Sequence, residues 1–246
     1  MNTLYLCGAG NPEGVRLARK INRAKRRWDR IVMLDDDLLR LGQSSLGVEV
    51  AGPFCLLEEA GPDSGEVASL VARTAVKRWA AWEKIERYGV PPATLIDPSV
   101  DQEGVEAGRG VIVYQNAFLG AEAIVGDGTA VFMGANVGHE ARVGRCCVIA
   151  PNAVLNARVQ LGDGVYVGSN SSVLPEINIG AWATIAAGTV VTRDVPTGAT
   201  IMGNPGRIVL TLELKRKMGW FAALPADVRH QLAHQTRAEV AVAQRA

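Results

Sequence analysis

The sequence is poor in the residues on which many binding and catalytic sites depend. Aromatic residues make up 5% of the 246 residues, and the chain has three histidines and four cysteines. The 26 basic and 25 acidic residues nearly cancel to a net charge of +1, so no electrostatic footprint for nucleic acid or for an anionic membrane stands out. No apolar run approaches the roughly 18 residues of a membrane span.

The cysteines and the first residues bear on location. Cys7, Cys55, Cys146 and Cys147 form no CxxC pair and no spacing typical of a disulfide framework. The chain starts with an apparent strand instead of the basic and apolar regions of a signal peptide. Reduced thiols are typical of the cytosol, so we expect a cytoplasmic protein without a membrane span.

The sequence does contain a six-residue repeat. An aliphatic residue occupies fifteen consecutive sixth positions from Ala107 to Val191, glycine very often follows it, and a second small residue comes four positions on. This period matches neither a helix nor an ordinary strand and is typical of a parallel β-helix. The aliphatic side chains would fill a prism too thin for aromatic rings, with the small residues at its corners. Because no unit buries a core alone, the coils must stack.

The residues before the repeat predict an α/β domain. Thr3–Cys7 and Arg30–Leu34 are expected to be strands, joined by the glycine-rich turn Gly8–Asn11 and a helix that extends to about Trp28, which is a βαβ unit of the Rossmann type. A further strand over about 67–72 and a helix over about 74–88 follow. We expect a Rossmann-like domain over 1–94, a β-helix over 95–209 and a short helical C-terminal extension over 210–246.

His139 is the histidine that the repeat singles out. It takes the third place of its hexad, where side chains point out of the prism. A carboxylate beside a histidine can fix its tautomer and raise its basicity, and Glu140 is the next residue. Neighbouring residues of a strand point to opposite faces, so Glu140 can help only at a corner or bend. The alternative is an ordinary surface histidine.

Three other features have simpler interpretations. Cys147 falls at an inward position that suits a small apolar residue. Cys146 points outward and could lie near the site. A structural role is favoured for both cysteines over thiol catalysis. His230 and His234 have helical zinc spacing, but the glutamate of an HExxH motif is absent, so a solvated helix face is favoured. The basic residues of the first helix are expected to be solvated, with contact to a diphosphate as the alternative.

The repeat resembles a known family. The stretch from Val137 to Val191, followed by Gly-Asn-Pro-Gly-Arg-Ile-Val, resembles the hexapeptide acyltransferases, whose β-helix is left-handed. The first strand, Gly-Ala-Gly turn, helix and Asp-Asp pair are similar to the sialic-acid and bacillosamine type of sugar O- or N-acetyltransferase. The resemblance covers about residues 3–209. It implies a homotrimer that uses acetyl-CoA, without a metal, to acylate an amino or hydroxyl group of a nucleotide-linked sugar bound by the N-terminal domain.

The same resemblance implies roles for individual residues. His139 would be the general base, Glu140 the acid that supports it, and the Ala157 N–H the donor to the thioester oxygen. The residues implied for acetyl-CoA are Ala157, Ser169, Ala187, Gly203, Asn204, Pro205 and Arg207. The residues implied for the sugar nucleotide are Gly8, Gly10, Asn11, Glu13, Gly14, Asp35 and Asp36.

The sequence departs from this family at the acceptor site. The turn reads Gly-Ala-Gly-Asn-Pro-Glu-Gly where the family commonly has Gly-X-Gly-His, and Val148 and Phe132 stand where members often carry histidine and asparagine. These departures favour an unusual sugar, or an acceptor that is not an amino sugar, and an acyltransferase with a non-sugar acceptor is an alternative. A hydrase similar to the γ-type carbonic anhydrases needs three histidines around the coils, whereas this β-helix has one. A non-catalytic β-helix scaffold or binding protein is the alternative.

Overall fold

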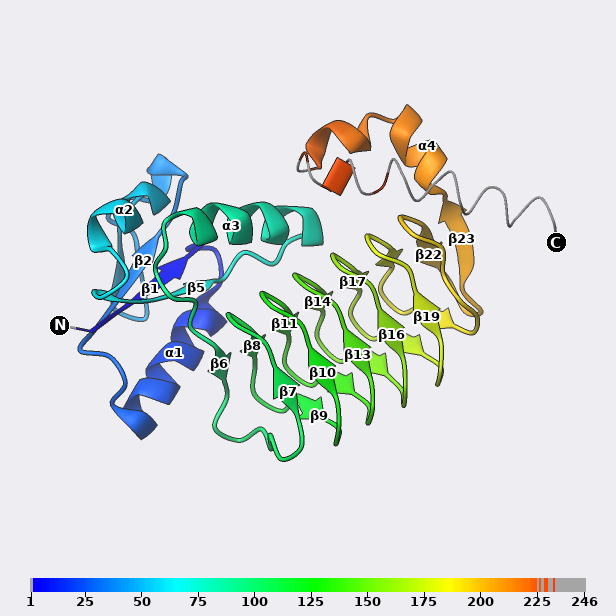
Figure 1. Ribbon diagram of the computed structural model, residues 1–246, viewed down its shortest axis with the longest axis horizontal. Helices are drawn as coiled ribbons and strands as arrows, with labels where there is room; N and C mark the ends of the chain where they lie inside the picture. Colours follow the sequence, from blue (N-terminus) through cyan, green and yellow to red (C-terminus); the bar gives the residue numbers. More distant parts are fainter. Residues whose placement is uncertain (1, 225, 227, 230–231, 233–246) are drawn as a thin grey trace.

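The computed structural model describes residues 2–224, 226, 228–229 and 232 of the chain. An α/β unit lies at one end of a long stack of coils, and a helical segment follows the last coil (Figure 1). This arrangement is the fold class that the sequence predicts: an α/β part, a left-handed parallel β-helix and a short helical tail.

The N-terminal sheet has five strands with buried aliphatic side chains. In sheet order they are β3 (Ser44–Ser45), β4 (Val48–Gly52), β2 (Arg30–Leu34), β1 (Thr3–Cys7) and β5 (Gly65–Ser69). All neighbours are parallel except β3 and β4. The sequence predicts β1 and β2 with their observed bounds and places β5 two residues too late. It misses β3 and β4.

Helices cover both faces of this sheet (Figure 1). α1 (Pro12–Lys25) starts with a proline, which the first helical position tolerates, and Asn11 caps it. Its buried stripe of Val15, Leu17, Ala18 and Ile21 packs on one face. The other face is covered by α3 (Ala75–Arg87), η2 (Phe54–Leu56) and α2 (Leu57–Ala60), while η1 (Leu38–Arg40) follows β2.

The strands of the β-helix stack in three sheets, here called faces. Each strand has two residues and pairs in parallel, except for the longer β22 and β23, which pair with each other in antiparallel fashion. Face 1 contains β7 (Glu106–Ala107), β10 (Ile124–Val125), β13 (Arg142–Val143), β16 (Gln160–Leu161) and β19 (Asn178–Ile179). Face 2 contains β6 (Leu95–Ile96), β8 (Ile112–Val113), β11 (Ala130–Val131), β14 (Val148–Ile149), β17 (Tyr166–Val167), β20 (Thr184–Ile185), β22 (Thr200–Met202) and β23 (Arg207–Leu210). Face 3 contains β9 (Phe118–Leu119), β12 (Asn136–Val137), β15 (Val154–Leu155), β18 (Ser172–Val173) and β21 (Val190–Val191).

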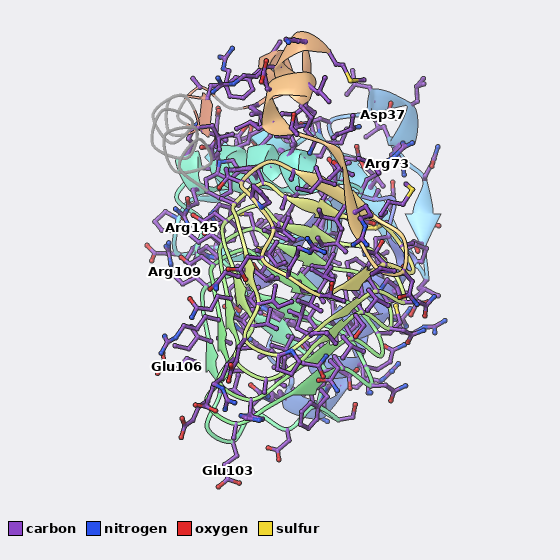
Figure 2. The ribbon with its side chains drawn as sticks, turned by 90° about the vertical axis from the view of Figure 1, so that its right-hand side faces the viewer. Asp37, Arg73, Glu103, Glu106, Arg109 and Arg145 are labelled. Carbon is purple, nitrogen blue, oxygen red and sulfur yellow. The ribbon has the colours of Figure 1, made fainter. Side chains whose placement is uncertain are left out.

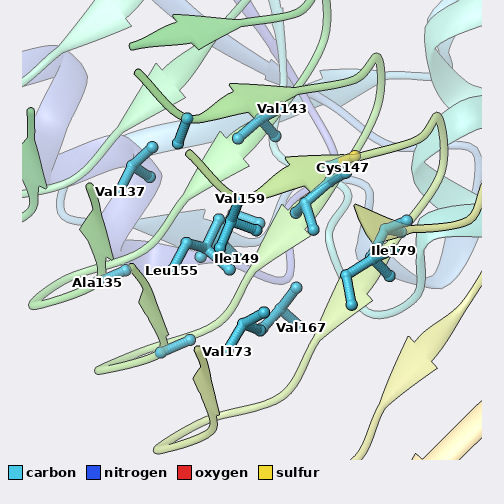
Figure 3. Packing of buried hydrophobic residues seen from close by; sticks show 14 of the residues in the cluster. Ala135, Val137, Val143, Cys147, Ile149, Leu155, Val159, Val167, Val173 and Ile179 are labelled. Carbon is cyan, nitrogen blue, oxygen red and sulfur yellow. The ribbon is translucent and has the colours of Figure 1, made fainter. Parts of the chain in front are cut away.

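The predicted repeat is the core of this prism. All fifteen aliphatic positions end a two-residue strand, and every one except Ala107 is buried in a single cluster (Figure 3). One detail of the prediction is wrong. The second small residue, such as Ala141, points into the prism and is fully buried, whereas the residue before it turns the corner with a positive φ, as Glu140 does at 55°. A left-handed backbone bends the chain there, and little space is left inside for the next side chain.

Three edges separate the faces, each named here after one of its residues. The His139 edge, between faces 3 and 1, carries Gly104, Glu122, Glu140, Arg158 and Glu176 at its corners. The Cys146 edge, between faces 1 and 2, carries Gly110, Gly128, Cys146, Gly164 and Trp182. The Asn152 edge, between faces 2 and 3, carries Asn116, Gly134, Asn152, Asn170 and Gly188.

Buried polar contacts fix the α/β unit against the first coils. Lys20 Nζ lies 2.7 Å from Oδ1 of Asp97, whose side chain is fully buried. The buried Arg78 of α3 donates from Nε to the carbonyl of Gly128 and from Nη1 to the carbonyl of Ser69, 3.1 Å away. These contacts set the position of the carboxyl edge of the sheet relative to the coils.

The tail packs on the Cys146 edge. α4 (Leu212–Lys217) and η3 (Trp220–Ala223) follow the last strand. Leu212, Leu224, Val228 and Leu232 form one cluster with Trp79 and Trp82 of α3 and with Trp182 and Cys146. The described part of the tail therefore covers the protein's own α3 and coils.

Candidate functional site

His139 and Glu140 form a hydrogen-bonded pair on the His139 edge. Nδ1 of His139 lies 2.8 Å from Oε2 of Glu140. The left-handed φ of Glu140 provides the corner that this contact requires. The two side chains are 55% and 44% exposed, so a substrate can reach both. An ionised carboxylate can only accept hydrogen bonds, so Nδ1 donates and Nε2 carries the lone pair of a potential base.

Arg158 holds Glu140 from the next coil. The hydrogen bond from His139 and, after it, the one from Arg158 lower the pKa of Glu140. Nη1 of Arg158 lies 3.3 Å from Oε2 of Glu140, and Nη2 lies 2.8 Å from Oε1 of Glu176. The edge thus carries a ladder of alternating charges that keeps Glu140 ionised beside the histidine.

Ala157 lies directly above His139 in the stack. The carbonyl of His139 accepts the N–H of Arg158 at 3.0 Å, and a Cβ on Gly138 would stand 2.8 Å from the nitrogen of Ala157. The Ala157 N–H donates no hydrogen bond to any residue that the structure describes. This backbone donor, one coil from His139, is therefore available to a ligand.

The other residues implied for acetyl-CoA gather at the Asn152 edge. Ser169 and Ala187 are stacked there, and the carbonyl of Ser169 accepts the N–H of Gly188 at 2.9 Å. The turn Gly203–Arg207 joins β22 to β23, and its Gly203 N–H donates to Oγ1 of Thr189 at 3.3 Å. The implied residues thus form two groups on two different edges of one chain.

A cavity of about 610 Å³ lies at the carboxyl ends of β1, β2 and β5, where open parallel sheets bind ligands. Its walls come from both parts of the molecule. They are Gly8, Gly10, Asn11, Asp35, Asp37, Arg40, Leu70, Val71, Ala72, Arg73, Lys77 and Phe132. Among these, Asp37 and Arg73 lie on the same side of the α/β unit (Figure 2).

Asp35 and Asp36, both predicted for this site, lie in different places in the structure. Asp35 lines the cavity, but its carboxylate already accepts the N–H of Ala9 at 2.7 Å and of Asp37 at 2.9 Å. Asp36 is placed elsewhere, because it pairs with Lys84 Nζ at 2.7 Å and accepts the N–H of Phe54. Asp37 stands in the cavity instead.

The remaining residues of the glycine-rich turn have structural contacts. Asn11 caps α1 and donates from Nδ2 to Oη of Tyr114 at 2.7 Å. Tyr114 stacks on Phe132 with ring centroids 4.8 Å apart, so the turn is anchored to the β-helix. Gly14 leaves room for Leu70, which a Cβ would approach to 2.4 Å. Glu13 faces Arg16 at 3.3 Å and does not line the cavity.

Sequence reasoning missed Arg40, Arg73 and Lys77. Arg40 ends η1, Arg73 lies on a loop and Lys77 lies in the first turn of α3, so they share no motif, and the fold brings them to one cavity. The sequence does mark Phe132, because it stands where members of the similar family often carry asparagine. It did not predict that Phe132 lines the cavity.

The cysteines do not offer a nucleophile near His139. Burial raises the pKa of both Cys146 and Cys147 to about 12. Cys146 points out of the prism as predicted, but it is buried against Trp82 and its neighbours instead of lying near the site. Thiols of such high pKa carry little thiolate at neutral pH.

Metal ligation and membrane insertion have no support in the described residues. Over these residues, no group of three or more His, Cys, Asp or Glu side chains is arranged to hold a metal ion. His230 and His234 lie outside the described residues. No described helix combines the length and the apolar character needed to cross a membrane.

Comparisons with known proteins agree with this geometry. The family model for the bacterial transferase hexapeptide, six repeats, matches residues 158–193. None of the curated proteins compared matches the chain. The acetyltransferase domain of PglB from Neisseria gonorrhoeae FA1090 is 27% identical with a TM-score of 0.77, over 85% of this chain and 100% of that one. The same domain in complex with acetyl coenzyme A gives 27% and 0.76, with the same coverage.

PerB from Caulobacter crescentus, solved in complex with CoA and GDP-perosamine, is similar as well. It is 25% identical with a TM-score of 0.72, over 85% of this chain and 97% of that one. The similarity to these structures thus extends across both the α/β unit and the coils. Together with the matching repeat, it supports the family of the hexapeptide acyltransferases for this chain.

Proposed function

We propose that this protein transfers an acetyl group from acetyl-CoA to an amino or hydroxyl group of a nucleotide-linked sugar. The observation that carries the proposal is the His139–Glu140 pair with the open N–H of Ala157 one coil away. The bound ligands of the similar structures, acetyl coenzyme A in PglB and CoA with GDP-perosamine in PerB, support the two substrate classes.

His139 is the general base in this proposal. Nε2 accepts the proton of the sugar nitrogen or oxygen as that atom attacks the thioester carbonyl. Glu140 holds Nδ1–H and stabilises the imidazolium that forms. The Ala157 N–H donates to the developing oxyanion. His139 then returns the proton to the departing sulfur, which releases CoA as a thiol.

The site is completed by a second copy of the chain. The cavity wall at Phe132 and the residues Ser169 and Ala187 lie at or beside the Asn152 edge, whereas His139 lies at the next edge. One complete face of the prism separates these two edges, whereas proton transfer requires contact at about 3 Å. A cyclic homotrimer that sets the Asn152 edge of one protomer against the His139 edge of its neighbour meets this requirement.

The test measures release of the CoA thiol with purified protein, acetyl-CoA and a panel of amino-sugar and hydroxy-sugar nucleotides. We expect His139→Ala to lower turnover by roughly 100-fold or more and to leave acetyl-CoA binding unchanged. Glu140→Gln should also lower turnover. Glu122→Gln is the matched control, because it changes the carboxylate at the corner one coil earlier and makes no contact with His139.

The same measurements separate an enzyme from a non-catalytic scaffold. An acyltransferase binds acetyl-CoA and its melting temperature rises with the ligand. A scaffold would show no thiol release and no shift with acetyl-CoA. Near-normal turnover of His139→Ala would refute the assignment of the base.

A further inference from the structure

The N-terminus of α1 offers a phosphate few free donors. Pro12, the first residue of α1, has no N–H. The N–H of Gly14 is bonded to the carbonyl of Asn11 at 3.1 Å and faces its side-chain oxygen at 3.4 Å. Binding of a diphosphate at the helix start, as in many nucleotide-binding βαβ units, therefore has weak support in this chain.

Three cations surround the same cavity. Arg40 comes from η1, Arg73 from the loop between β5 and α3, and Lys77 from the first turn of α3. The carboxylates of Asp35 and Asp37 offset two of these charges, so the cavity walls keep one net positive charge. Asp37 and Arg73 mark this part of the surface (Figure 2).

The free ends of these cations are open to a ligand. Nε of Arg40 lies 3.7 Å from both Asp35 and Asp37, which is too long for a hydrogen bond. Its Nη1 and Nη2 lie 3.5 and 3.6 Å from where a Cβ of Gly10 would stand, so they face the turn. Within the described structure, the side chains of Arg40, Arg73 and Lys77 donate no hydrogen bond.

We infer that Arg40, Arg73 and Lys77 bind the diphosphate of the sugar nucleotide, in place of the N-terminus of α1. The inference rests on the proposed function, because it identifies the part of the acceptor that the cavity recognises. Guanidinium and ammonium groups form strong charge-assisted hydrogen bonds with phosphate oxygens. Gly10 has no side chain to keep a phosphate away from Arg40. The protein is then selective for nucleoside-diphosphate sugars over free sugars.

The experiment measures binding without acetyl-CoA, by calorimetry with UDP, GDP, CDP and dTDP and with the matching nucleosides. We expect at least one diphosphate to bind roughly 10-fold or more tighter than its nucleoside. In the double variant Arg73→Gln/Lys77→Gln its affinity should fall by about 10- to 100-fold. Both residues are exposed, and an unchanged melting temperature confirms folding.

The matched control is the double variant Arg23→Gln/Lys25→Gln. It removes the same charge from exposed positions at the far end of α1, and it should keep the diphosphate affinity. An equal loss in both double variants would show a long-range charge effect and overturn the inference. The inference would also be overturned if none of the diphosphates bound more tightly than the matching nucleoside.

The outcomes also separate this inference from the proposed function. If acetyl transfer occurs but the Michaelis constant for the acceptor is unchanged in Arg73→Gln/Lys77→Gln, the three-cation assignment is wrong and the proposed function stands. If diphosphate binding depends on Arg73 and Lys77 but no sugar nucleotide is acetylated, the assignment stands and the proposed function fails.

Discussion

A mixture of two inactive variants should recover activity if the site lies between protomers. His139→Ala removes the proposed base and leaves the cavity intact. Gly10→Phe obstructs the cavity and leaves His139 in place. Gly10 has no positive φ, and the three atoms nearest to a Cβ there are side-chain atoms of Arg40, at 3.5 to 3.9 Å. A phenyl ring therefore adds no backbone strain, and it takes up space beside Arg40 in the wall of the cavity.

The expected recovery follows from counting interfaces in a cyclic trimer. An interface is active only if its cavity comes from a His139→Ala protomer and its histidine from a Gly10→Phe protomer. Random assembly at equal concentrations gives each condition a chance of one half, so about one quarter of the wild-type rate should return. A site contained in one chain would give no recovery, because every chain in the mixture carries one defect.

The assay is thiol release by the whole oligomer population, homotrimers included, after the two variants are co-expressed at equal levels. A mixture of His139→Ala with wild type should give about half of the wild-type rate under either arrangement, and it serves as the control for exchange. Recovery no higher than the rates of the separate variants would refute the intersubunit site. If Gly10→Phe alone kept a normal turnover and a normal Michaelis constant for the acceptor, the cavity would not be the acceptor site.

Three further predictions concern the fold and the edge ladder. Ile149→Ala should lower the free energy of unfolding by about 2–5 kcal/mol, because Ile149 is fully buried in the prism, while Leu174→Ala at a 40% exposed site should cost less than about 1 kcal/mol; equal losses in denaturant unfolding would contradict the assigned core. Burial lowers the pKa of Lys215 to about 8, so Lys215→Met should stabilise the protein at pH 7 by about 1–3 kcal/mol, even though it removes the contact of Nζ with the Trp220 ring. Below pH 8 the folded state must carry a buried charge, and the cost disappears as the pH rises from 8 toward 10.5, so a gain that persists at pH 10.5 would exclude this cause. Arg158→Gln removes one of the two side-chain hydrogen bonds that hold the Glu140 carboxylate, so kcat should fall, but by less than in Glu140→Gln, and an unchanged kcat would show that Arg158 does not act through Glu140.

The repeat made most of the β-helix predictable, because one inward side chain in each hexad is a strong and local signal. The same pattern predicted that His139 points out of the prism. It could not establish that Glu140 bends back, since that depends on the left-handed φ of the corner. The corner itself was assigned to the wrong residue, because size alone does not distinguish a residue that fills the prism from one that bends the chain.

The cavity of the α/β unit was less predictable for a physical reason. Asp35 and Asp36 are adjacent in sequence, yet one bonds to the glycine-rich turn and the other to Lys84 on α3. Arg40, Arg73 and Lys77 come from separate segments and share no spacing. Such a site is defined by the edge of the sheet and by the docking of the coils, which a local pattern does not specify.

The absence of insertions in the repeat has a functional consequence. His139 and Ala157 are eighteen residues apart, as are Ser169 and Ala187, and eighteen residues make one complete coil in the parallel register of each face. A single inserted residue between His139 and Ala157 would either bulge at the edge or move the open N–H to another position along the face. The unbroken period therefore keeps the proposed base and the proposed backbone donor one coil apart on the same edge, while the proposed acceptor cavity lies at a different edge.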